Sequence, residues 1–254
     1  MSDARVAPMQ NKVPEVTAAF WTIKILSTTV GETGADYLAV HIGLGTTITI
    51  AITLSLLAAS LIAQLRKRAY VPWIYWLTVV LVSIVGTQLT DVLSDGLGVS
   101  LYISTTVFAL LLCAVFATWY RKERTLSIST IVTRKRELFY WTAILVTFAL
   151  GTAAGDLATE AIGLGFSFGV LVFGILLFLM GCAAYLGANP MLIFWLAYIL
   201  TRPFGASLGD LLSQSRNYGG MGMGTVMTSA VFLTVIVVLV SIHASARPRP
   251  GQVT

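Results

Sequence analysis

The stretch YWTAILVTFALGTAAGD, residues 140–156, contains the pattern that decides the fold. An aromatic residue precedes Trp141, Gly151 follows ten residues after this tryptophan, and Asp156 follows fifteen residues after it. The same spacing occurs in three other sets: Phe20, Trp21, Gly31 and Asp36; Tyr75, Trp76, Gly86 and Asp91; and Phe194, Trp195, Gly205 and Asp210. Four matches at identical spacing indicate an internal repeat.

The composition is typical of a membrane protein. Of the 254 residues, 57% are apolar and only 11% are charged, whereas soluble domains carry about 25% charged residues. Crossing a hydrocarbon core of about 30 Å takes roughly 20 apolar residues in a helix. Suitable segments lie at about 16–38, 46–65, 71–93, 100–120, 137–159, 164–186, 190–212 and 224–243. We therefore predict an all-α polytopic membrane protein with eight transmembrane helices.

The repeat units each hold two of these spans. Within a single membrane domain, residues 1–254, the units cover about 12–67, 68–132, 133–188 and 189–246. Because a unit contains two spans, all four units enter the membrane from the same side and form parallel repeats.

Positive charge predicts the orientation. All Lys and Arg residues except Lys24, Arg202 and Arg216 fall in the two tails and in the loops after the second and fourth spans. The positive-inside rule then places both termini in the cytoplasm. This distribution between apolar segments also argues against nucleic acid as the partner of a chain with net charge +5. The six tryptophans all fall at predicted cytoplasmic span ends, where indole rings favour the interface.

The sequence resembles the bacterial inner-membrane proteins that are built from four tandem two-helix repeats of unknown function, each with one tryptophan. The resemblance covers about residues 12–243 and rests on the tryptophan, glycine and aspartate spacing in all four units. It implies a multi-pass protein of the bacterial inner membrane and gives no biochemical activity. The oligomeric state is left open.

Oxygen-bearing side chains form a column on one face of each odd-numbered span, because residues four apart share a helix face. Fifteen residues at 1.5 Å place each motif aspartate about 22 Å from its tryptophan, in the outer third of the hydrocarbon. We expect the odd-numbered helices to face one another, so that the aspartates form a ring. The alternative is that the aspartates are solvated at the outer helix ends. The columns are Thr28, Glu32 and Asp36; Thr87, Asp91 and Asp95; Thr152, Asp156 and Glu160; and Ala206, Asp210 and Gln214.

Two cations lie within the spans. Lys24 is near the cytoplasmic end, where its long side chain can snorkel to the interface. Arg202 is expected to pair with a carboxylate or with a backbone carbonyl freed by Pro203. The glycine pairs 151/155 and 205/209 either allow close helix packing or unwind the helix beside the aspartates.

Carboxylate and hydroxyl oxygens suit hard cations such as Mg²⁺, Mn²⁺ or Ca²⁺. We therefore expect a transporter or exporter of a small cation, with proton coupling left open. The predicted metal ligands are Glu32, Asp36, Asp91, Asp156 and Asp210, assisted by Thr28, Thr87 and Thr152. The residues predicted to surround these ligands, without binding the ion directly, are Lys24, Arg202, Asp95, Glu160, Trp21, Trp76, Trp141 and Trp195.

Neither enzymatic activity nor a cofactor is expected, because no nucleotide motif or catalytic triad is readable. A divalent cation enters only as substrate, and the lipid bilayer is the other partner. Two alternatives stay open. One is a non-transport scaffold or sensor whose repeats only pack together. The other is an intramembrane enzyme that uses Glu32 and Asp36 as acid and base.

Overall fold

The computed structural model describes residues 9–40 and 46–245. Within these ranges the chain is helical and contains no strand. Its eight α-helices are α1 (Ala18–Val40), α2 (Thr46–Arg66), α3 (Pro72–Asp91), α4 (Leu101–Glu123), α5 (Arg134–Asp156), α6 (Gly165–Tyr185), α7 (Pro190–Ser213) and α8 (Thr225–Ser245). Two π-helical turns, η1 (Val92–Gly96) and η3 (Leu157–Ala161), extend α3 and α5, and two short 3₁₀ turns, η2 (Ile128–Thr130) and η4 (Arg216–Tyr218), lie in loops.

The odd-numbered helices form a closed inner ring. Helix α1 packs against α3 and α7, and α5 completes the ring by packing against the same two helices. More than half of the residues in the apolar windows of α3, α5 and α7 are buried, against fewer than a third in the even-numbered helices. The expected convergence of the odd-numbered helices is therefore present in the fold.

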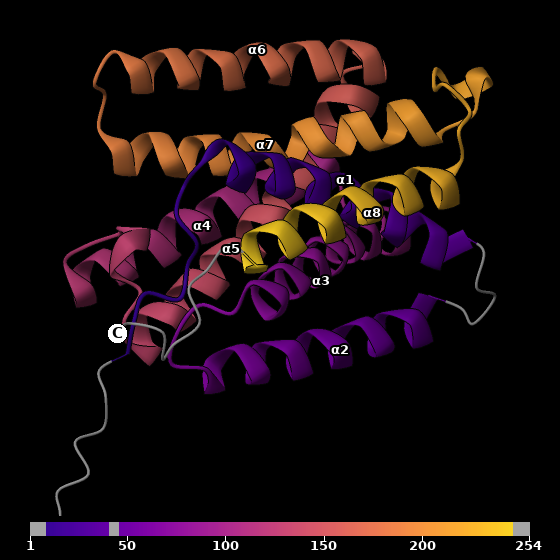
Figure 1. The fold of residues 1–254 in the computed structure, drawn as a ribbon. Helices are drawn as coiled ribbons and strands as arrows, with labels where there is room; N and C mark the ends of the chain where they lie inside the picture. Colours follow the sequence, from indigo (N-terminus) through magenta and orange to yellow (C-terminus); the bar gives the residue numbers. More distant parts are fainter. Residues whose placement is uncertain (1–8, 41–45, 246–254) are drawn as a thin grey trace, which may run out of the picture.

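The even-numbered helices lie outside this ring, and each packs mainly on the odd-numbered helix of the following repeat. Helix α2 covers α3, α4 covers α5, α6 covers α7, and α8 returns to cover α1. Figure 1 shows the result, with α2 and α6 on opposite sides of the bundle. The two helices of one repeat therefore pack mainly against other repeats. The contact between α8 and α1 joins the last repeat to the first.

The motif glycines allow the inner helices to approach closely. Each glycine, ten residues after its tryptophan, faces the residue seven after the tryptophan of the next repeat. The pairs are Gly31 with Ser83, Gly86 with Phe148, Gly151 with Arg202, and Gly205 with Thr28. Because the same two positions meet at all four interfaces, equivalent residues lie at the same depth around a pseudo-fourfold axis. The structure thus assigns the motif glycines to packing.

Seven of the eight helices are long and apolar enough to cross a membrane, so the chain is a multi-pass membrane protein. The exception is α1, which carries Lys24, Glu32 and Asp36. Two of these side chains, Lys24 and Glu32, are buried inside the bundle. Helix α1 can therefore sit at the centre of the fold, covered by α3, α7 and α8, although it is not among the seven helices that qualify as spans by length and composition.

A short N-terminal segment packs at the end of the bundle where the repeat tryptophans lie. The Lys12 Nζ atom lies 2.5 Å from Glu137 Oε2, and both side chains are buried. The same ammonium donates to the carbonyl oxygens of Gln64 and Leu65 at 3.2 Å. Lys12 therefore ties the end of α2 to the beginning of α5, a link that its position in the N-terminal tail did not suggest.

The interfaces at the motif glycines are tight enough to be tested by adding one methyl group. In Gly86→Ala the new Cβ would lie 2.7 Å from Phe148 Cβ and 3.2 Å from the backbone nitrogen of Ala149, so α3 and α5 must separate. We expect a loss of about 1–3 kcal/mol in stability, seen as a lower thermal midpoint of the purified protein in detergent. Gly181→Ala on α6, where a Cβ meets nothing within 4 Å, is the control and should be neutral or slightly stabilising. Equal midpoints for the two variants would contradict the close packing.

Candidate functional site

The guanidinium of Arg202 joins all four inner helices. It projects from α7 and its Nη2 atom lies 2.8 Å from Glu32 Oε2 on α1. The same atom donates to Thr152 Oγ1 on α5 at 2.7 Å and contacts Thr87 Oγ1 on α3. Its Nη1 atom donates to the backbone oxygen of Thr28 at 2.9 Å. Arg202 is completely buried and makes both of the pairings predicted as alternatives, one with a carboxylate and one with a backbone carbonyl, although this carbonyl belongs to α1 and is not the one freed by Pro203.

The repeat spacing explains how this cluster forms. The three side chains that meet Nη2, Glu32, Thr87 and Thr152, stand eleven residues after their tryptophans. The fourth repeat has Ala206 at the equivalent position, which leaves space on the axis. Arg202 stands one turn earlier in that repeat and fills this space. Three equivalent oxygen-bearing side chains and one guanidinium therefore share a single layer.

The carboxylates of the odd-numbered helices and of the turns that extend them line one cavity, on the side of the Arg202 layer away from the tryptophans. Its volume is about 520 Å³. Seven of the eleven acidic residues of the chain contribute to its wall: Glu32, Asp36, Asp91, Asp95, Asp156, Glu160 and Asp210. Glu32 and Asp210 are buried, whereas Asp95 and Glu160 are exposed. The structure thus brings the four motif aspartates around a common space instead of dispersing them.

The carboxylates around the cavity do not form a compact set of metal ligands. No group of three or more His, Cys, Asp or Glu side chains is close enough to hold a metal ion, as far as the described residues show. The hydroxyls of Thr87 and Thr152 contact Arg202, and the hydroxyl of Thr28 donates to the backbone oxygen of Ile25 at 2.6 Å. None of the three threonines lines the cavity. In this structure the hydroxyls of Thr87 and Thr152 are therefore engaged by Arg202 and that of Thr28 by the backbone, and their role as ion ligands stays a prediction.

Two π-helical turns follow the aspartates of the central repeats. Turn η1 begins directly after Asp91, and turn η3 begins directly after Asp156. In each, an amide bonds to a carbonyl five residues earlier, with Leu97 N to Val92 O and Ile162 N to Leu157 O both at 2.9 Å. The widened turns come after the aspartates and not at the glycines where the sequence allowed local unwinding. Such turns are frequent at functional sites.

Lys24 is buried on the other side of the Arg202 layer. It is fully enclosed, and no hydrogen-bond acceptor contacts its Nζ atom within the described part of the chain. The ammonium instead lies 4.2 Å from the ring centroids of both Phe148 and Tyr198. The expectation that Lys24 snorkels to the interface is wrong. The aromatic residues that precede the tryptophans separate it from the bundle end, and Tyr75 and Tyr140 join there through their hydroxyls at 2.5 Å.

We call aromatic plug the cluster formed by the four repeat tryptophans and the aromatic residues that precede them, Phe20, Tyr75, Tyr140 and Phe194. Trp76, Trp141 and Trp195 are buried, and their rings contact the aromatic residues that precede them. Trp21 is half-buried and packs on Phe20 and Phe194. The rings of Trp76, Trp141 and Trp195 therefore pack inside the bundle instead of facing outward, whereas Trp73 is exposed; the position of these tryptophans at a membrane interface stays a prediction.

A family model described as Repeat of Unknown Function (DUF347) matches four segments of the chain, residues 19–70, 74–125, 139–187 and 193–248. These segments correspond to the four repeats, and the match confirms the resemblance seen in the sequence. No curated protein matches the chain. No solved structure matches it either.

The ion pair between Arg202 and Glu32 is testable by removing its partners in turn. In Arg202→Met, Glu32 loses its buried partner, and stability is expected to fall by about 3–5 kcal/mol. In the double variant Arg202→Met/Glu32→Gln the unpaired charge is gone, so part of this loss should be recovered. Thermal midpoints in detergent measure both effects, and Arg216→Met, at an exposed position, is the control. Additive losses in the double variant would contradict the pairing.

Removing the charge of Lys24 should have the opposite effect on stability from removing that of Arg202. Lys24→Met keeps the length of the side chain and removes an ammonium that has no hydrogen-bond acceptor. We expect the thermal midpoint to stay the same or rise, because the buried charge gains only contacts with aromatic rings. A midpoint that falls as far as that of Arg202→Met would show that Lys24 has a stabilising partner.

Proposed function

The chain belongs to the DUF347 repeat family, and we propose that it is a membrane carrier for a small cation. The observation that carries this proposal is the gathering of seven acidic side chains, from all four inner helices, around one cavity. The cation enters this cavity and is held among the carboxylates. Four of the seven acids, the motif aspartates, stand at equivalent positions of the four repeats, so each inner helix offers the cation one carboxylate.

Electrostatics support a cation over any other class of solute. The chain as a whole carries net charge +5, yet the cavity wall carries no cation. A cleft that is lined by one sign of charge and walled by low-dielectric protein concentrates counter-ions and repels ions of its own sign. An anionic substrate is therefore disfavoured. Arg202, directly below the cavity, contributes one positive charge, which Glu32 neutralises at 2.8 Å.

The open spacing of the carboxylates favours an ion that keeps part of its hydration shell. Mg²⁺ dehydrates reluctantly and is commonly held through waters by one or two carboxylates. A hydrated divalent cation fits this cavity better than a fully coordinated one, and Mn²⁺ accepts the same hard ligands. Protons are the natural coupling ion, since intramembrane carboxylates commonly relay them.

A closed axis supports a carrier mechanism over an open channel. Below the cavity the axis is filled by the Arg202 cluster, then by Lys24, and then by the aromatic plug. Passage of a cation requires the Arg202 guanidinium to leave Glu32. We infer that the incoming cation and Arg202 compete for the Glu32 carboxylate, so that binding on one side loosens the seal toward the other.

We propose the location and topology along with the function. All eight helices cross the bacterial inner membrane, with α1 shielded by the others, and both termini lie in the cytoplasm by the positive-inside rule. The acidic cavity then opens away from the cytoplasm. The same closed axis also favours a second candidate, a sensor or scaffold that binds a cation in the cavity without moving it.

The aspartates Asp91 and Asp156 test the proposal, because both line the cavity and neither forms an ion pair within the described residues. In purified protein reconstituted into vesicles, Asn variants at these positions should slow Mn²⁺ or Mg²⁺ flux by about tenfold, the equivalent of about 1.4 kcal/mol. Glu15→Gln, which removes an exposed carboxylate outside the cavity, should leave the flux unchanged.

Two outcomes would count against transport. If the wild-type vesicles bind the ions without passing them, the sensor is the better assignment. If the Asn variants pass the ions at the wild-type rate while the protein is folded, the carboxylate cavity is not the path.

A further inference from the structure

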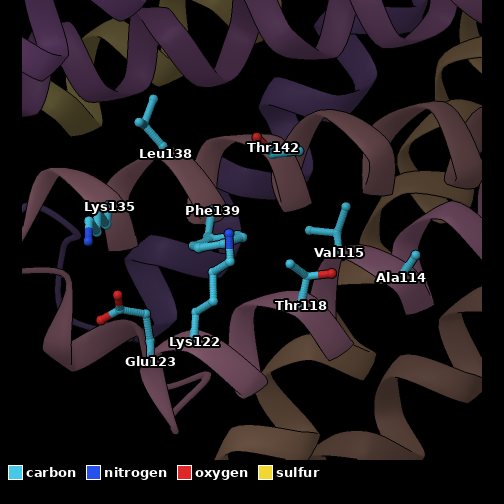
Figure 2. Close-up of a pocket in the computed structure, with 9 residues that line it drawn as sticks. All are labelled: Ala114, Val115, Thr118, Lys122, Glu123, Lys135, Leu138, Phe139 and Thr142. Atoms are coloured by element: carbon cyan, nitrogen blue, oxygen red, sulfur yellow. The ribbon is translucent and has the colours of Figure 1, made fainter.

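A second cavity lies between α4 and α5, on the outer surface of the bundle. Its volume is about 680 Å³. Lys122 from α4 and Lys135 from α5 stand at one end of it, and Ala114 and Thr142 line it deeper along the two helices. Figure 2 shows the two lysines on separate helices, with Phe139 between them. None of its lining residues is shared with the acidic cavity.

Positive charge at the mouth of this groove is not neutralised. Lys122 and Lys135 are both exposed, and neither forms an ion pair among the residues described. The one carboxylate in the lining, Glu123, accepts a hydrogen bond from Arg136 Nε at 2.9 Å. The mouth of the groove is therefore complementary to a compact anion with several oxygen acceptors.

The rest of the groove is lined mainly by apolar side chains, together with Thr118 and Thr142, and runs along the outer surface of the bundle. Ala114 precedes Lys122 by eight residues, which is about 12 Å along α4. Its walls include Val115, Leu138 and Phe139, and the flanking Leu110 and Leu111 are exposed on the outer helix. A free anion would use only the mouth. A molecule with an anionic head and a hydrocarbon tail would use the whole length.

We propose that this groove is a binding site for an anionic phospholipid. The lipid phosphate lies between Lys122 and Lys135, and an acyl chain follows the apolar wall toward Ala114. Basic pockets between helices at the cytoplasmic side of a membrane recognise acidic headgroups in this way. The site binds together two helices that belong to different repeats, and its occupancy is independent of what the acidic cavity transports.

The full-length protein in neutral detergent tests this site. The probes are phosphatidylglycerol, phosphatidylcholine and inorganic phosphate, and the readouts are the thermal midpoint and the lipid retained in native mass spectra. We expect phosphatidylglycerol to raise the midpoint of the wild type by several degrees and to remain bound. The variant Lys122→Gln/Lys135→Gln should lose both effects. The control Lys67→Gln/Arg68→Gln removes two charges from exposed positions in another loop and should keep them.

A second variant separates the groove from its charge. Ala114→Trp fills the apolar part, leaves both lysines in place, and should also weaken retention of phosphatidylglycerol. Three results would overturn the proposal: an unchanged effect of phosphatidylglycerol in the double lysine variant, an equal effect of phosphatidylcholine on the wild type, or reproduction of the effect by inorganic phosphate alone.

Discussion

Everything in the bundle centre depends on how one buried guanidinium is satisfied. Burying a charge is costly unless a counter-charge and hydrogen bonds compensate it. Arg202 is compensated through its two terminal nitrogens, which contact a residue on each of the other three inner helices, while its Nε atom has no partner among the described residues. The four helices are therefore held in one register, and the tight glycine contacts bring them close enough for a single side chain to reach all of them. The acidic cavity above and the enclosed Lys24 below are consequences of that register.

The repeats are alike where they build the bundle and differ where they meet the axis. Tryptophan, glycine and aspartate recur at every unit and serve, in turn, the aromatic plug, the interfaces and the cavity wall. At the levels between them the four units carry different residues, such as Glu32 in the first and Arg202 in the fourth. A symmetric scaffold thus presents an asymmetric centre.

Much of this arrangement could be predicted from spacing alone. The recurring tryptophan, glycine and aspartate predicted four equivalent units and the convergence of the odd-numbered helices. Spacing could not predict that Thr87 and Thr152 bind Arg202, because that contact depends on Ala206 leaving room across the axis. Nor could it predict that Lys24 stays enclosed, which depends on aromatic residues from the neighbouring helices. The link between Lys12 and Glu137 joins residues 125 positions apart and has no local signal.

The return of α8 to cover α1 has a consequence for the synthesis of the protein. Among the eight described helices, α1 is synthesised before the other seven and is the one that does not qualify as a span by length and composition. Its permanent neighbours α7 and α8 are made last. The nascent α1 must therefore wait for most of the chain, shielded by insertion machinery or by α3, before its charged side chains are enclosed. The packing of these eight helices is complete only when α8 has been inserted.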